Sequence, residues 1–139
     1  MNFAKIAELF DSLEKTGSRL EMTSQLADFF KALPAIEAPS FVYLLQGKLG
    51  SDFLGIKLGL GEKLVEQSIA TVSGFSVAEV TQKFRQTGDI GQTAEFFVSQ
   101  KKQQSFFSKS LTLKKVHENL LKITTIEGTG TQETKIRLL

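Results

Sequence analysis

Two segments of the chain place glycines and lysines at the expected start of a helix, a combination that could hold a phosphate. In the first, Gly59 and Gly61 come directly before a helical pattern, and Lys57 and Lys63 flank them. Backbone N–H groups in the first helical turn have no partner within the helix, and the helix dipole adds partial positive charge there. We therefore predict that this segment contacts phosphate. The alternative is an ordinary turn that needs glycine for a positive φ.

The second segment is richer in hydrogen-bond donors. Gly128, Thr129, Gly130, Thr131 and Gln132 follow one another, and Lys135 falls one turn after Thr131 on the same face of the predicted helix. Threonine hydroxyls and backbone amides are common partners of nucleic-acid phosphates. The Gly-Lys-Ser/Thr end and the preceding strand of a P-loop are both missing, so nucleotide hydrolysis is disfavoured. A capped helix after a flexible link is the alternative.

Residues for other kinds of chemistry are scarce. The chain has no cysteine and one histidine, His117, so we predict neither a disulfide nor a metal site. We find no nucleophile–base set or pair of carboxylates with catalytic spacing, and we predict no catalytic residue. Most of the 12 phenylalanines fall at helical core spacing and are interpreted as packing residues. A group of lysines is interpreted as a solvated rim, with a diffuse phosphate-facing patch as the alternative: Lys101, Lys102, Lys109, Lys114 and Lys115.

Composition is that of an ordinary globular domain. The 139 residues are 41% hydrophobic and 23% charged, which suffices for one domain with a core. No apolar run is long enough to span a bilayer and no signal peptide is recognised, so we expect an intracellular protein, cytoplasmic in a prokaryote. Residues 1–72 hold 7 Lys and Arg against 9 Asp and Glu, whereas residues 73–139 hold 10 against 6. The basic second half weakly favours a polyanionic partner.

Helical periodicity runs through the whole chain. Apolar residues recur at helical spacing, and no comparable segment alternates with a period of two. The sequence predicts an all-α fold, an irregular array of about seven to eight helices. The expected helix starts are marked by capping residues: Ser18 with Glu21, Pro39-Ser40, Ser76 with Glu79, Thr112 and Thr131. The last helix ends the chain on apolar residues without a stop signal, so we expect a chain truncated at its C-terminus.

Four blocks of residues, in this order, make the chain similar to a known family. The blocks are Tyr43–Leu49, Asp52–Leu64, Thr87–Gly91 with Ala94 and Glu95, and Gly128–Gln132 with Lys135–Leu139. The chain resembles the N-terminal DNA-binding domain of the archaeal and eukaryotic type of ATP-dependent DNA ligase. The similarity covers essentially all 139 residues, and the loop around Phe106 and Phe107 fits it as well.

The resemblance implies a helical domain that lies against the minor groove of duplex DNA beside a nick. It implies the catalytic domains of the parent ligase as partners, with roles in replication, repair and recombination. The family's Lys-x-Asp-Gly motif is absent from the chain, so ATP and magnesium are implied for the parent ligase and no cofactor for this chain. Residues 1–139 would be the N-terminal part of a ligase DNA-binding domain, without its second helical half and the catalytic domains.

We therefore predict non-catalytic, largely sequence-independent binding of nicked duplex DNA, which positions it for ligation. Two alternatives remain open from the residues alone. One is a helical protein-interaction module that docks through the apolar face around Ile136 and Leu139. The other is a helix-hairpin-helix-like module outside the ligase family.

Overall fold

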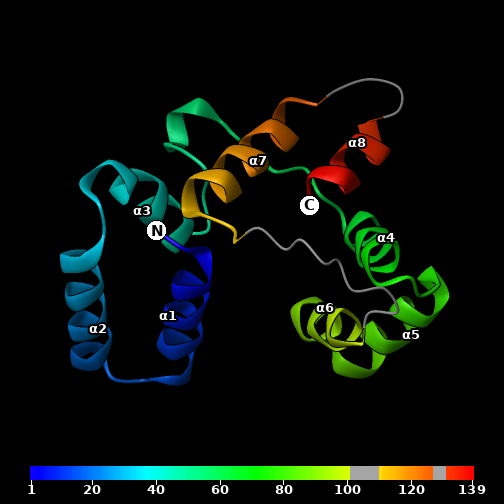
Figure 1. Cartoon of the computed structure of the whole chain (residues 1–139), viewed down its shortest axis with the longest axis horizontal. Helices are drawn as coiled ribbons and strands as arrows, with labels where there is room; N and C mark the ends of the chain where they lie inside the picture. Colours follow the sequence, from blue (N-terminus) through cyan, green and yellow to red (C-terminus); the bar gives the residue numbers. More distant parts are fainter. Residues whose placement is uncertain (101–109, 127–130) are drawn as a thin grey trace. The chain divides into compact units, whose positions relative to one another are not determined.

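The computed structural model describes residues 1–100, 110–126 and 131–139, and the regular structure in these ranges is helical (Figure 1). One isolated bridge joins Asn2 and Thr112. The all-α prediction is confirmed. The α-helices are α1 (Phe3–Lys15), α2 (Arg19–Ala32), α3 (Ala38–Leu45), α4 (Glu62–Ser73), α5 (Val77–Thr87), α6 (Ile90–Ser99), α7 (Leu113–Thr125) and α8 (Thr131–Leu138), and two 3₁₀ turns are η1 (Ala35–Glu37) and η2 (Asp52–Leu54).

The chain divides into two compact units, which we describe separately. Unit 1 takes the described residues of Met1–Leu58 and Lys109–Thr124, and unit 2 those of Gly59–Ser108 and Thr125–Leu139. None of the helices in the described ranges is long and apolar enough to cross a membrane.

The core of unit 1 forms around Phe41 of α3. Its side chain is fully buried, and its ring centroid lies 4.9 Å from that of Phe29 and 5.2 Å from that of Phe30, both on α2. Phe10 of α1 stacks on the same ring at 6.1 Å. Figure 1 shows α1 and α2 side by side. The apolar stripes predicted for these helices therefore meet at one aromatic cluster.

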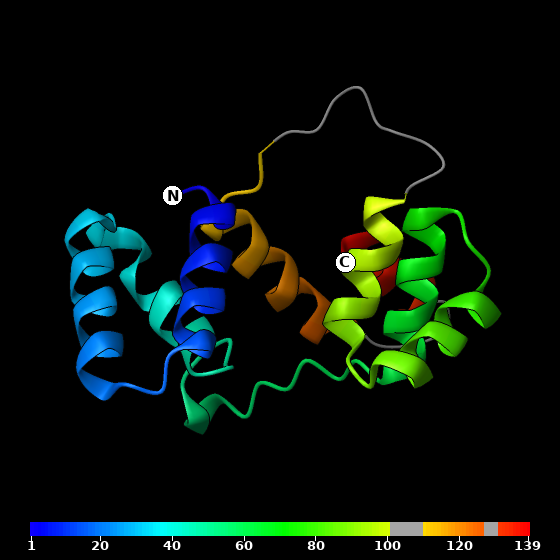
Figure 2. The ribbon, with the colours of Figure 1, turned by 90° about the horizontal axis from the view of Figure 1, so that it is seen from below.

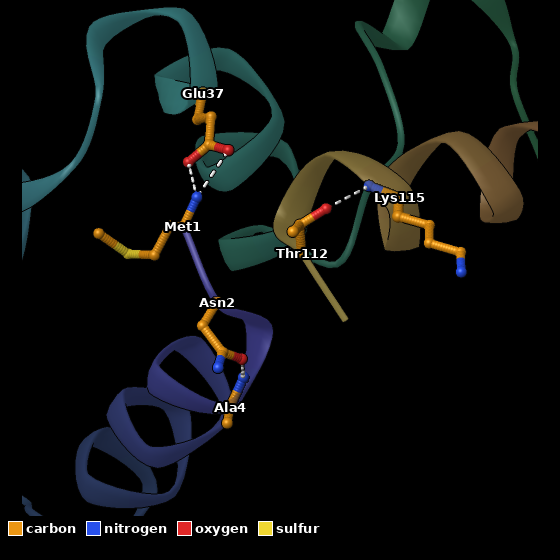
Figure 3. Close-up of polar contacts among 6 residues, drawn as sticks. All are labelled: Met1, Asn2, Ala4, Glu37, Thr112 and Lys115. Atoms are coloured by element: carbon orange, nitrogen blue, oxygen red, sulfur yellow. Dashed lines mark hydrogen bonds and ion pairs between the residues drawn. The ribbon is translucent and has the colours of Figure 1, made fainter. Parts of the chain in front are cut away.

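The first residues of the chain form hydrogen bonds with both η1 and the start of α7. The Met1 ammonium lies 2.6 and 2.8 Å from the two carboxylate oxygens of Glu37 (Figure 3). Leu113 N–H donates to the Met1 carbonyl at 3.0 Å. The Thr112 hydroxyl accepts from the Lys115 N–H at 3.2 Å, as a cap of α7 should. Thr112 is thus confirmed as the capping residue.

In unit 2, helix α4 packs against α5, α6 and α8 (Figure 2). The core of unit 2 is a cluster of Ile69, Ala70, Val80 and Phe97. The capping box predicted for α5 is complete, because Ser76 accepts from the backbone of Glu79 and the Glu79 carboxylate accepts from the Ser76 N–H at 2.8 Å. Local capping chemistry therefore sets the start of α5.

Three of the predicted helix starts differ in detail from those in the structure. Ser18 does cap α2, but the Glu21 carboxylate accepts from Thr16 at 2.7 Å, so the reciprocal half of that capping box is missing. Helix α3 begins at Ala38, before the predicted start at Pro39-Ser40, because η1 leads directly into it. Thr131 is the first residue of α8, so it lies within the helix and not before it as a cap would.

Candidate nucleic-acid interface

The segment that carries Lys57 leaves α3 through a well-formed helix end. Gly47 has a φ of 68°, its N–H donates to the Leu44 carbonyl at 2.9 Å, and the Lys48 N–H donates to the Tyr43 carbonyl at 2.8 Å. This pair of bonds is a Schellman motif, which requires a left-handed residue and therefore favours glycine. The loop that ends at Gly61 begins here.

His117 of α7 holds this loop in place. Its Nε2 lies 3.0 Å from the Leu49 carbonyl, and its Nδ1 lies 3.3 Å from the Ser40 hydroxyl. A carbonyl only accepts, so Nε2 carries the proton and donates in this bond. Sequence reasoning missed this role, because a lone histidine gives no signal for partners distant in the chain.

Beyond Leu49 the loop makes a tight turn, η2, whose tip is apolar. Leu54 N–H donates to the Ser51 carbonyl and Gly55 N–H to the Asp52 carbonyl, both at 3.1 Å. The Phe53 side chain at the tip is 87% exposed. Phe53 is therefore not among the phenylalanines that pack in the core, and sequence reasoning did not single it out.

The lysines of this loop differ in their partners. Lys48 pairs with Asp52 at 2.8 Å. Lys57 is exposed and forms no ion pair with the residues that the structure describes. Its charge is therefore available to an external anion.

Helix α4 starts as the glycine spacing predicted. Gly61 is the N-cap with extended φ and ψ of −81° and 157°, and it offers no side chain to cap the first turn. Lys63 lies in that turn, is exposed, and forms no ion pair with any described residue. The uncapped N–H groups and the Lys63 ammonium can both meet an anion here, beside the Glu62 carboxylate of the same turn.

The two positions before α4 that hold glycine differ in whether the backbone conformation favours it. Gly59 adopts a φ of 61°, in the left-handed region, whereas the φ of Gly61 is ordinary. A Cβ added at either position would meet nothing within 4 Å. The turn therefore explains why glycine occurs at position 59, but neither backbone strain nor crowding inside the chain explains it at position 61.

A groove of about 400 Å³ runs between α4 and α5, next to this helix start. Lys63 and Arg85 line it together with the acids Glu62 and Glu66. Glu66 is buried and accepts a hydrogen bond from Thr81 of α5. Arg85, which sequence reasoning did not single out, brings a second cation to the face that holds Lys63.

The other predicted site lies on α8, which packs against α4 in the same unit. Thr131 and Gln132 are in its first turn, and Lys135 follows one turn later, half-buried and without an ion pair in the described part of the chain. Gly128, Thr129 and Gly130 lie outside the described residues. Unit 2 thus holds Gly59, Gly61 and Lys63 as well as Thr131, Gln132 and Lys135, whereas Lys57 belongs to unit 1.

Comparison with known proteins gives this arrangement its context. A family model described as DNA ligase N terminus matches residues 2–139. DNA ligases of Acidianus ambivalens, Nitrosopumilus maritimus and Thermococcus fumicolans are 42%, 37% and 34% identical, each aligned to 100% of this chain. The chain spans about a quarter of the length of these curated relatives, 24–25% of each. Since the family match extends over nearly every residue, the chain belongs to the DNA ligase N-terminus family.

Proposed function

We propose that this chain binds duplex DNA without catalysing a reaction, and that it positions nicked DNA for ATP-dependent ligation. The observation that carries the proposal is the start of α4, where an uncapped first turn coincides with a lysine that lacks an acidic partner. Such a helix start is a common phosphate site. Lys57 and Lys135 also lack ion pairs with the described residues, whereas Lys15, Lys31 and Lys48 are each paired with an aspartate within 2.8 Å.

Contacts to phosphates position a duplex without reading its sequence, so binding should be largely sequence-independent. In this proposal Gly128–Gln132, Lys135, Lys57, Gly59, Gly61 and Lys63 face the DNA backbone. The contribution to ligation is orientation, because holding the two ends in line removes part of the entropic cost of joining them. Adenylylation, with its ATP and magnesium, would belong to the three quarters of the relatives that this chain does not match.

Salt dependence of binding to a labelled nicked duplex tests the proposal. Fluorescence anisotropy should show affinity falling as salt rises, with a log–log slope of about −0.9 for each phosphate neutralised. Lys63→Gln should weaken binding and reduce the slope by about 1. Lys15→Gln is the matched control, since Lys15 is already paired with Asp11, and it should leave both values unchanged. Absence of duplex binding by the wild-type chain at low salt would refute the proposal.

An apolar surface of unit 2 favours protein docking as a second candidate function. Val65, Ile69 and Val72 of α4 line a pocket of about 190 Å³ with Val98 and Leu139. Val72, Val98 and Leu139 are each nearly half exposed, and exposed apolar residues that line one pocket indicate a contact surface. We would test it by adding the chain in trans to the remaining three quarters of a matched ligase. Saturable association that Val72→Asp abolishes, without any affinity for DNA, would favour this function.

A further inference from the structure

The Met1 ammonium and the Glu37 carboxylate form an ion pair that differs from those on the helix surfaces. Both carboxylate oxygens accept from the ammonium, at 2.6 and 2.8 Å (Figure 3). The side chains of Met1 and Glu37 are 9% and 16% exposed, whereas those of the paired Lys15 and Asp11 are 72% and 61% exposed. Water therefore screens the Met1–Glu37 pair far less, and removing either charge leaves the other poorly solvated.

Two backbone hydrogen bonds join the residues beside this ion pair to the start of α7. Phe3 N–H donates to the Leu111 carbonyl at 2.8 Å, and Leu113 N–H donates to the Met1 carbonyl at 3.0 Å. Met1 thus contacts both Glu37, at the end of η1, and Leu113, the first residue of α7. The ion pair fixes the backbone that accepts the hydrogen bond from α7.

Helix α7 carries the effect of this attachment to the loop after α3. Leu113 at its start is fully buried, in one cluster with Ile6 and Phe41. His117 follows four residues later on the same face of the helix, and its Nε2 donates to the Leu49 carbonyl at 3.0 Å. A displacement of the first turn of α7 therefore also moves the imidazole that holds the loop.

We propose that the free α-amino group of Met1 is a conformational latch, which holds the start of α7 in unit 1 and thereby positions His117, and that Nα-acetylation opens it. In this modification the carbon–sulfur bond of an acetyl thioester breaks and the acyl carbon bonds to the α-nitrogen. The thiol leaves with one proton of the ammonium, and a second proton is released. The neutral amide that results has one N–H, so it cannot bridge both Glu37 oxygens and leaves the carboxylate without its cation. The latch lies within unit 1 and is independent of the proposed DNA binding.

Amide hydrogen exchange measured by NMR tests the latch on the wild-type chain, on the chain Nα-acetylated during expression, and on Glu37→Gln. In both altered forms the amide protons of Phe3 and Leu113 should exchange about tenfold faster, the scale on which one hydrogen bond to a charged group stabilises. Asp28→Asn is the matched control, because it removes a carboxylate from an exposed ion pair with Lys31 in the same unit. It should leave these exchange rates unchanged. Mass spectrometry verifies the acetylation, and circular dichroism establishes that each form is folded.

The single histidine of the chain gives a second readout. The imidazole NMR signals of His117 should shift in both altered forms and stay in place in Asp28→Asn. Acetylation combined with Glu37→Gln should change exchange by less than the sum of the two separate effects, because both break one ion pair. If the acetylated chain does not fold, Glu37→Gln supplies the same readouts alone. Wild-type exchange at Leu113 in the altered forms, or unshifted His117 signals, would overturn the inference and leave the proposed DNA binding intact.

Discussion

Replacing His117 with alanine tests whether the loop between α3 and α4 is held by the fold of unit 1. The imidazole forms bonds of 3.0 Å to the Leu49 carbonyl and 3.3 Å to the Ser40 hydroxyl. A neutral hydrogen bond contributes about 0.5–1.5 kcal/mol, and the longer bond falls at the lower end of that range. Together with the packing of a half-buried ring, we expect His117→Ala to lower the free energy of unfolding by about 2 kcal/mol.

Two further variants separate the contributions of the two bonds. His117→Gln places an amide donor near the position of Nε2, so it should retain the bond to Leu49 and recover roughly half of the lost stability. Ser40→Ala removes only the weaker bond. In the double variant of His117→Ala and Ser40→Ala the effects should be non-additive by about 0.5–1 kcal/mol, because the two residues share one contact.

Urea denaturation measures these differences. The single tyrosine of the chain, Tyr43, lies on α3 of unit 1 and reports the unfolding of that unit by fluorescence. With a typical slope of about 2 kcal/mol per molar urea, His117→Ala should lower the midpoint by about 1 M. If the midpoint of His117→Ala matched that of the wild type, or if His117→Gln were no better than alanine, the imidazole would not hold the loop and the reasoning would be refuted.

Three other predictions follow from the structure. Phe41→Ala should cost about 3–5 kcal/mol, because a fully buried ring is removed from an aromatic cluster; a loss under about 1 kcal/mol in urea denaturation would contradict this core. Gly59→Ala should destabilise unit 2 by about 1 kcal/mol through its positive φ, which thermal unfolding measures. Gly61→Ala should keep the wild-type stability and weaken DNA binding if phosphate approaches its backbone, which fluorescence anisotropy measures. Thr81→Val should cost about 1–3 kcal/mol, because it leaves the buried Glu66 carboxylate without this donor, and Thr81→Ser, as the control, should remain near wild-type stability.

Local signals in the sequence predicted much of the fold. Ser76, Thr112 and the Gly61 helix start lie where their capping or backbone chemistry placed them. These features depend on hydrogen bonds within a few residues, which a sequence displays directly. The half-formed box at Ser18 shows the limit of such signals, because the Glu21 carboxylate accepts from the Thr16 hydroxyl and not from the Ser18 N–H.

The candidate site was only partly accessible from the sequence. Glycine and lysine spacing pointed to Gly59, Gly61 and Lys63, and the structure sets them at the start of α4, although their contact with DNA remains a prediction. Arg85 was missed because it joins Lys63 only through the packing of α5 on α4. Phe53 was missed because an aromatic residue that packs and one that is exposed look the same in a sequence.

By itself the sequence determined the all-α class, the starts of α2, α4, α5 and α7 and, through its ordered blocks, membership of the DNA ligase N-terminus family. The tertiary structure alone decided the partners of His117, Met1 and Glu66, because each bond joins residues at least 15 positions apart. It also decided that the ring of Phe53 lies in solvent while that of Phe41 is buried. Helix-cap hydrogen bonds join residues that are close in the sequence, so the sequence predicts them. Burial and long-range hydrogen bonds arise only when helices pack.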